Sequence, residues 1–216
     1  MKKDQDTAIL FFTRTAKNEA AVKSWTSIPD LDYQIASTLI NRTRKRLQTA
    51  PFPVFPVEEN QQKGNSFGEK LSNAFKLIFD KGFRYVIAIG NDCQNFSPDW
   101  LQIQEQLSTG RTVLGPDLRG GVYLLGISSD QNYNKIFKHI SWNTNQVFGQ
   151  LKQYFHNHYS IEYKPDINSG EDLKSDVSLA DLIKSFLKEN FWHCSKEIII
   201  NSSIPFHQSL RAPPII

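Results

Sequence analysis

The sequence predicts an α/β protein in three layers, with helices on both faces of a mainly parallel β-sheet. Continuous apolar runs at 8–12 and 85–89 are typical of strands that are buried on both faces. Amphipathic helical patterns lie between such runs, and strands that alternate with helices favour a parallel sheet. Polar residues directly follow the apolar runs, at the strand ends where open α/β sheets bind their ligands.

The first half of the chain predicts two strands and three helices. Apolar residues recur at helical spacing from Leu31 to Leu47, which predicts a long amphipathic helix. Pro56 cannot donate a ladder hydrogen bond, so its strand is expected near a sheet edge. The expected elements are a strand at 8–12, helices at 18–25 and 31–47, a strand at 52–57 and a helix at 67–79.

The second half continues the alternation. Ser97 and Pro98 are expected to open a helix, as its cap and its first-turn proline. The other expected elements are strands at 85–89, 112–114, 122–127 and 161–163, and helices at 131–138, up to Tyr154, and at 179–187. No linker interrupts the pattern, so a single domain is expected over 1–216. The segment 202–216 is expected as an extended tail docked on this subunit or on a neighbour, and the second case predicts a homo-oligomer.

Composition narrows the class of protein. Lys and Arg number 25 against 22 Asp and Glu, a balance too mild to indicate nucleic acid or an anionic membrane as partner. Cys93 and Cys194 lie far apart, which argues against a disulfide framework or a zinc site. No apolar run reaches the roughly eighteen residues of a membrane span, and the polar start carries no signal-peptide pattern. A cytoplasmic location is therefore expected.

Polar clusters mark the expected ligand site at the strand ends. Asp92 follows a buried run and a glycine, and one carboxylate with phosphate oxygens and waters is a typical magnesium arrangement. Asp92 could instead cap the following turn. Arg14 could bind a phosphate through its planar guanidinium, or it could be a solvated surface cation. Thr13 and Asn91 share these two clusters, and Asp166 belongs to a third.

Two further features admit a functional and a structural interpretation. Gly120 and Gly121 could permit close approach of the backbone to a ligand, or they could simply form a turn. The basic residues at 42–46 could contact nucleic acid, but such a cluster is more often a solvated helix face. No serine, histidine and acid trio suggests nucleophilic catalysis.

An ordered series of motifs runs through most of the chain. The motifs are Gly64-x-x-x-Gly68-Glu69-Lys70, the run from Val86 to Cys93, Val113-Leu114-Gly115-Pro116, Gly120-Gly121-x-Tyr123-Leu124-Leu125-Gly126, Ile140-Ser141-Trp142-x-Thr144-x-x-Val147, and Asp166-Ile167-x-x-x-x-Asp172-Leu173. This series resembles a bacterial domain-of-unknown-function family with the nucleotide-diphospho-sugar transferase (GT-A type, Rossmann-like) fold, whose members are regarded as glycosyltransferases. The resemblance covers about 7–173 and leaves 174–216 outside it.

The resemblance implies a metal-dependent glycosyltransferase or nucleotidyltransferase that acts on a nucleotide-sugar or a nucleoside triphosphate. It implies a nucleotide over the first strand, a divalent metal (Mg or Mn), and a small-molecule acceptor of unknown identity. The corresponding residues are Thr13, Arg14, Lys23 and Asn91 for the nucleotide, Asp92 and Asp166 for the metal, and Gly120, Gly121, Tyr123, Trp142 and Thr144 for the acceptor pocket.

Three departures from the family pattern favour an alternative. The loop after the first strand lacks the family's glycine, Arg119 stands where the family has an acid, and Asn168 replaces the second acid of the later motif. Each change weakens the expected binding of metal or triphosphate. The alternative is a catalytically impaired family member that acts as a ligand- or protein-binding module.

Overall fold

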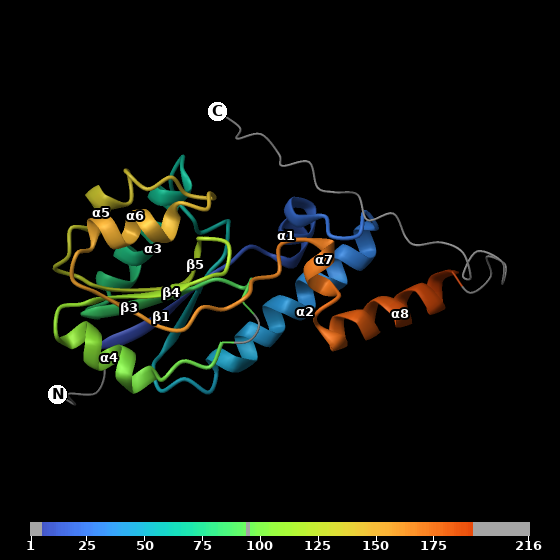
Figure 1. The fold of residues 1–216 in the computed structure, drawn as a ribbon, viewed down its shortest axis with the longest axis horizontal. Helices are drawn as coiled ribbons and strands as arrows, with labels where there is room; N and C mark the ends of the chain where they lie inside the picture. The colour runs from blue at the N-terminus through green and yellow to red at the C-terminus, as the bar shows by residue number, and fades with distance from the viewer. Residues whose placement is uncertain (1–5, 94–95, 192–216) are drawn as a thin grey trace. The chain divides into compact units, whose positions relative to one another are not determined.

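The computed structural model describes residues 6–93 and 96–191 (Figure 1). The contacts divide the chain into two compact units. The sheet unit comprises Met1–Thr15 and Leu39–Asp166, and the helical unit comprises Ala16–Thr38 and Ile167–Ile216. The boundary falls within one helix, α2 (Pro29–Leu47). The expectation of a single domain over 1–216 stays a prediction, and each unit is described by itself.

A six-stranded sheet in the order β2-β1-β3-β5-β4-β6 forms the centre of the sheet unit. Its strands are β1 (Thr7–Phe12), β2 (Val54–Val57), β3 (Tyr85–Ile89), β4 (Thr112–Pro116), β5 (Val122–Ser128) and β6 (His158–Ser160). The pairs β1–β2, β1–β3 and β4–β6 are parallel, whereas β5 is antiparallel to both of its neighbours. Five strands therefore point the same way, which confirms the predicted mostly parallel α/β sheet. Pro56 lies in the edge strand β2, as predicted.

Helices lie on both faces of this sheet (Figure 1). On one face, α3, α5 and α6 contribute to a core with the side chains of Leu10 and Val86. On the other face, α4 packs so closely that a Cβ built on Gly126 would lie 3.3 Å from Leu107 Cδ2. These helices are α3 (Phe67–Phe79), α4 (Trp100–Ser108), α5 (Tyr133–Ile136) and α6 (Val147–Tyr154).

Two predicted elements are misplaced along the chain. The helix after β3 begins at Trp100, and its N-cap is Asp99, whose carboxylate accepts a hydrogen bond of 3.0 Å from Gln102 N. Ser97 and Pro98 therefore precede the helix instead of opening it. The strand predicted at 161–163 is β6 instead, because pairing with β4 begins where Thr112 lies opposite His158. Ile161 still donates its backbone N–H to Leu114 O at 2.9 Å.

The helical unit contains α1 (Ala16–Lys23), the start of α2, α7 (Gly170–Leu173) and α8 (Val177–Phe191). Asp32, in the first turn of α2, is buried and accepts hydrogen bonds of 2.8 Å from both Thr26 N and Thr26 Oγ1. In the described part of the chain, no helix is long and apolar enough to cross a membrane. Cys194 and the predicted tail at 202–216 lie outside the described residues, so the predicted homo-oligomer stays a prediction.

Candidate functional site

Thr13 and Asn91 meet at one edge of the sheet. The neighbouring strands β1 and β3 are parallel, so the residues that follow them lie at the same edge. Thr13 is 3% exposed and Asn91 5% exposed. The Thr13 hydroxyl lies 3.2 Å from Asn91 Oδ1 and 3.0 Å from Arg14 O, so its single hydrogen is within reach of both acceptors. Two buried polar side chains thus converge where open α/β sheets bind ligands.

The segment after β2 holds the segment after β1 in place. Gln62 Nε2 donates to Thr13 O at 2.8 Å and to Val57 O at 3.1 Å. Glu59 accepts hydrogen bonds of 2.5 Å from both the backbone N–H and the hydroxyl of Thr15. Gln62 and Glu59 were not predicted as site residues. The available signal was their position just after the strand at 52–57, because β2 is parallel to β1 and ends at the same edge.

Asp117 organises the loop between β4 and β5. Its Oδ1 accepts from Arg119 N at 2.7 Å and from Gly121 N at 2.8 Å. Gly120 has a φ of +88°, and a Cβ on it would lie 2.1 Å from Asn145 O. A Cβ on Gly121 would lie 2.2 Å from Asp117 Oδ2. The glycine pair is therefore required by the loop's own close approaches, whatever ligand the loop meets.

Arg119 forms an ion pair with Asp166. Arg119 Nη1 lies 2.7 Å from Asp166 Oδ1 and 3.2 Å from Asp166 O. The Asp166 side chain is 9% exposed, whereas that of Arg119 is 48% exposed. Burial raises the pKa of Asp166 above its usual value, and the charges of Asp117 and Asp92 raise it too, while Arg119 lowers it. The charges of Asp117 and Asp92 thus act on Asp166, and the Arg119 guanidinium contacts Asp166 directly.

The ion pair of Arg119 with Asp166 competes with the two-acid metal site that the family resemblance implies. In the described ranges, no group of three or more His, Cys, Asp or Glu side chains could hold a metal ion. Asp166 Oδ1 accepts from Arg119 at 2.7 Å, so a divalent ion would have to bind the other carboxylate oxygen or displace the guanidinium. The other predicted metal ligand, Asp92, is half-buried just after β3 and is not part of the ion pair between Arg119 and Asp166.

Three of the residues predicted for the acceptor pocket have polar atoms with intramolecular partners. The Tyr123 hydroxyl donates to Glu162 O at 3.0 Å, and burial raises the pKa of this phenol. Trp142 Nε1 donates to Phe137 O at 2.8 Å, and the indole packs against Phe67 with ring centroids 5.2 Å apart. Thr144 is exposed and donates to Ser141 O at 2.6 Å. Tyr123 and Trp142 thus have clear structural roles.

Lys23 belongs to the helical unit, whereas the other predicted nucleotide ligands Thr13, Arg14 and Asn91 belong to the sheet unit. The Lys23 ammonium donates to Asn168 Oδ1 within its own unit. Arg14 is half-buried directly after Thr13. The structure therefore brings Thr13 to Asn91 where β1 and β3 end, with Arg14 next to Thr13 in the chain, and it pairs Lys23 with Asn168.

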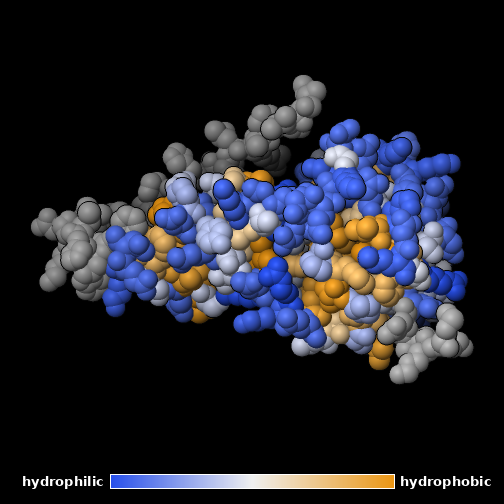
Figure 2. All heavy atoms as spheres, turned by 180° about the vertical axis from the view of Figure 1, so that it is seen from behind, coloured by the Kyte–Doolittle hydropathy of each residue, from blue (hydrophilic) through white to orange (hydrophobic). Residues whose placement is uncertain are grey.

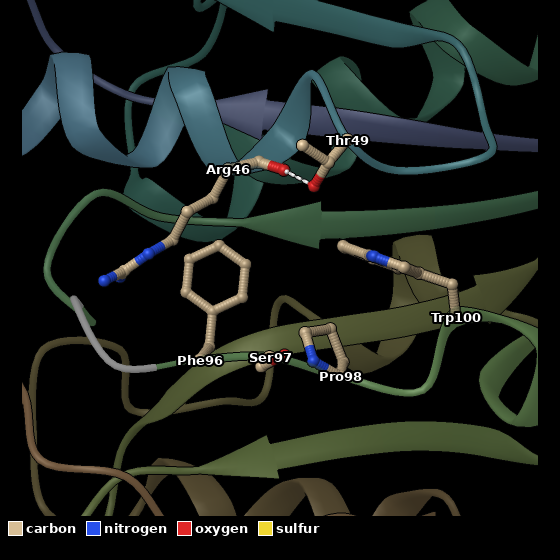
Figure 3. Close-up of a pocket in the computed structure, with 6 residues that line it drawn as sticks. All are labelled: Arg46, Thr49, Phe96, Ser97, Pro98 and Trp100. Atoms are coloured by element: carbon tan, nitrogen blue, oxygen red, sulfur yellow. Dashed lines mark hydrogen bonds between the residues drawn. The ribbon is translucent and has the colours of Figure 1, made fainter.

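A pocket of about 330 Å³ lies elsewhere in the sheet unit and contains none of the predicted site residues. The Arg46 guanidinium lies over the Phe96 ring, 5.8 Å from its centroid. Arg46 Nη1 is buried and has no hydrogen-bond partner among the described residues. The pocket is lined by Arg46, Thr49, Phe96, Ser97, Pro98 and Trp100 (Figure 3).

The surface seen in Figure 2 is mainly hydrophilic, with areas of apolar residues between polar ones.

Residues 22–144, more than half of the chain, match the model of a family described as "Uncharacterized protein conserved in bacteria (DUF2064)". The chain belongs to this family. The matched segment of the DUF2064 protein includes Asn91, Asp92 and the glycine pair, and leaves Thr13 and Asp166 outside. A search of curated proteins gives no match.

Solved structures with a similar fold include one described as a putative nucleotide-diphospho-sugar transferase from Desulfovibrio desulfuricans G20. It matches the DUF2064 chain with a TM-score of 0.65 at 16% identity, over 89% of this chain and 92% of that one. A homolog of Mycobacterium tuberculosis rv0371c from mycobacterium sp. strain JC1 matches with a TM-score of 0.46 at 11% identity, over 83% and 98%. The first likeness shows that the fold resembles that of a nucleotide-diphospho-sugar transferase.

Proposed function

We propose that this DUF2064 protein is a transferase that binds a nucleotide-sugar or a nucleoside triphosphate at the edge of its sheet, as a glycosyltransferase or a nucleotidyltransferase. The observation that supports it best is the meeting of buried Thr13 and Asn91 at the ends of two adjacent parallel strands. We also propose the three-layer, Rossmann-like arrangement of the GT-A type for the chain. The TM-score of 0.65 with a nucleotide-diphospho-sugar transferase-like structure supports that arrangement.

In this proposal the protein positions the donor and neutralises its phosphates. Glycosyl transfer from a nucleotide-diphospho-sugar releases a nucleoside diphosphate, and nucleotidyl transfer from a triphosphate releases pyrophosphate. The protein therefore stabilises charge more than it supplies covalent chemistry. Thr13 and Asn91 carry the hydroxyl and amide that hydrogen-bond the nucleotide, and Arg14 follows them as a cation for phosphate. Lys23 stays a further predicted phosphate ligand, and the divalent ion expected at Asp92 and Asp166 stays a prediction.

The acceptor side of the proposed site is the loop with Gly120 and Gly121. Gly120 O accepts a hydrogen bond of 2.9 Å from Phe148 N, so this loop is fastened to the start of α6. Thr144 presents an exposed side chain in the segment that precedes α6. We propose that Tyr123 and Trp142 support this surface from within, because their polar atoms already have intramolecular partners.

Thermal and urea denaturation with a panel of nucleotides and nucleotide-sugars tests the proposal. A ligand present at a hundred times its dissociation constant stabilises the native state by about 2.7 kcal/mol. Thr13→Val should reduce that stabilisation, because it removes the hydroxyl next to Asn91. Thr109→Val is the matched control, since the Thr109 hydroxyl donates only to Gln106 O at the end of α4. A folded protein that no ligand of the panel stabilises would contradict the proposal.

The ion pair of Arg119 with Asp166 favours a second candidate, a non-catalytic binding module. Asp166, one of the two acids expected to bind the metal, is instead paired with Arg119 at 2.7 Å. Release of the nucleotide product from a bound donor separates the two candidates. A transferase or hydrolase consumes the donor, whereas a binding module returns it intact after prolonged incubation with a range of acceptors.

A further inference from the structure

The loop between β4 and β5 holds Arg119 so that its guanidinium contacts Asp166. Its backbone N–H donates to Asp117 Oδ1 at 2.7 Å, and the next residue, Gly120, has a φ of +88°. The loop thereby fixes the start of the Arg119 side chain. The guanidinium then contacts Asp166 twice, at Oδ1 and at the backbone oxygen. The loop geometry and the ion pair with Asp166 therefore both fix the position of the Arg119 guanidinium.

The position of this cation disagrees with the metal site that the family resemblance implies. A divalent ion would need carboxylate oxygens directed toward it. Asp166 Oδ1 instead has the Arg119 nitrogen at 2.7 Å, and the guanidinium would repel a divalent ion that approached the same oxygen. Asp117 and Asp92 carry further negative charge near Asp166. Arg119 is a positive charge that offsets part of it, through its contact with Asp166.

We infer that Arg119 replaces a divalent ion shared by Asp92 and Asp166, so that a nucleoside diphosphate group binds at this edge without metal. The inference rests on the proposed function, because it concerns the same site. Guanidinium groups bind phosphate oxygens through paired N–H donors, and they remain charged at all working pH values. The Arg119 side chain is 48% exposed, so solvent and solutes reach it while Asp166 orients it.

The test is calorimetric titration of the full-length protein with uridine, guanosine, cytidine and adenosine diphosphates, in excess EDTA and in excess Mg²⁺. We expect the diphosphate that binds to have the same dissociation constant in both conditions, within about twofold. Arg119→Ala should weaken its binding in EDTA at least about tenfold, which corresponds to about 1.4 kcal/mol. Arg111→Ala is the matched control, because it removes the same charge from an arginine whose side chain contacts Gln106.

Two further variants keep the inference falsifiable if Arg119→Ala folds poorly. Arg119→Lys keeps the charge and loses the paired donors, so we expect weaker binding that still does not require metal. Arg119→Asp should bind diphosphate only when Mg²⁺ is present. If the wild-type protein binds diphosphate only with Mg²⁺, and Arg119→Ala does not weaken that binding, the inference is overturned and the proposed function stands. No binding of any diphosphate in either condition would overturn the proposed function and the inference with it.

Discussion

Gly120 adopts a left-handed backbone conformation, and its Cα lies against the backbone of Asn145. We predict that Gly120→Ala destabilises the protein by clearly more than the roughly 1–2 kcal/mol of a left-handed alanine, because the new Cβ would lie 2.1 Å from Asn145 O. Gly110→Ala is the control, since Gly110 has a φ of +80° and nothing within 4 Å of an added Cβ. Urea denaturation measures both. Equal losses would show that the loop yields at Asn145.

Asp166 gives the protein a pH dependence of defined sign. Its pKa is raised in the folded state, chiefly by burial, so the folded protein binds this proton more tightly than the unfolded chain does. Its contribution to the free energy of unfolding therefore falls as the pH rises from about 3.9 through the raised pKa, and it is constant above that. Asp166→Asn should lack this component.

The free energy of unfolding, measured for wild type and Asp166→Asn across the acid range, checks this prediction. The difference, wild type minus variant, should decrease as the pH rises through that window. An increase would mean that the ion pair with Arg119 outweighs burial and lowers the pKa of Asp166.

At the scale of elements, two helical glycines should respond to alanine in opposite directions. A Cβ on Gly68 in α3 would lie 2.5 Å from Trp142 Nε1 and 2.6 Å from Phe137 O, so Gly68→Ala must displace the indole or the helix. We expect it to destabilise the protein by about 1–3 kcal/mol. Gly149 in α6 has nothing within 4 Å, so Gly149→Ala should stabilise by about 0.5–1 kcal/mol. Chemical denaturation measures both changes, and the same sign for both would contradict the structure.

Some elements could be predicted from the sequence to the residue, and others could not. The bounds of α3 and β3 are as predicted, because apolar residues alternate clearly with polar ones in the helix and fill the strand. The predicted start of α4 was wrong. Ser97 and Asp99 are both good N-cap residues, and the local sequence alone does not choose between them. The β6 register depends on pairing with β4, which a local pattern does not contain.

The candidate site was predictable only where it follows from strand ends. Thr13 and Asn91 come together because each follows a buried apolar strand and the two strands are parallel neighbours. The contact of Arg119 with Asp166 joins residues 47 positions apart, and a single sequence carries no signal for such a pair. The structural role of Trp142 was also missed, since its partner Phe137 O is a backbone atom.

At the level of the whole molecule, the predicted site residues divide between the two compact units. Thr13, Asn91, Asp92 and Asp166 all belong to the sheet unit, and Lys23 belongs to the helical unit. The proposed site can therefore be argued within the sheet unit alone. There, five strands of the same direction end at one edge, and the reversed strand β5 begins at that edge.

A nucleotide donor is proposed to bind where β1 and β3 end. Backbone amide chemical shifts of the full-length protein, titrated with the nucleoside diphosphate or nucleotide-sugar that stabilises it most, report this binding residue by residue. We predict the largest changes at Thr13, Asn91 and Asp117–Gly121, with Gly110 and Gly149 unchanged. Changes confined to the pocket of Arg46, Phe96 and Trp100, or no changes at saturating ligand, would contradict it.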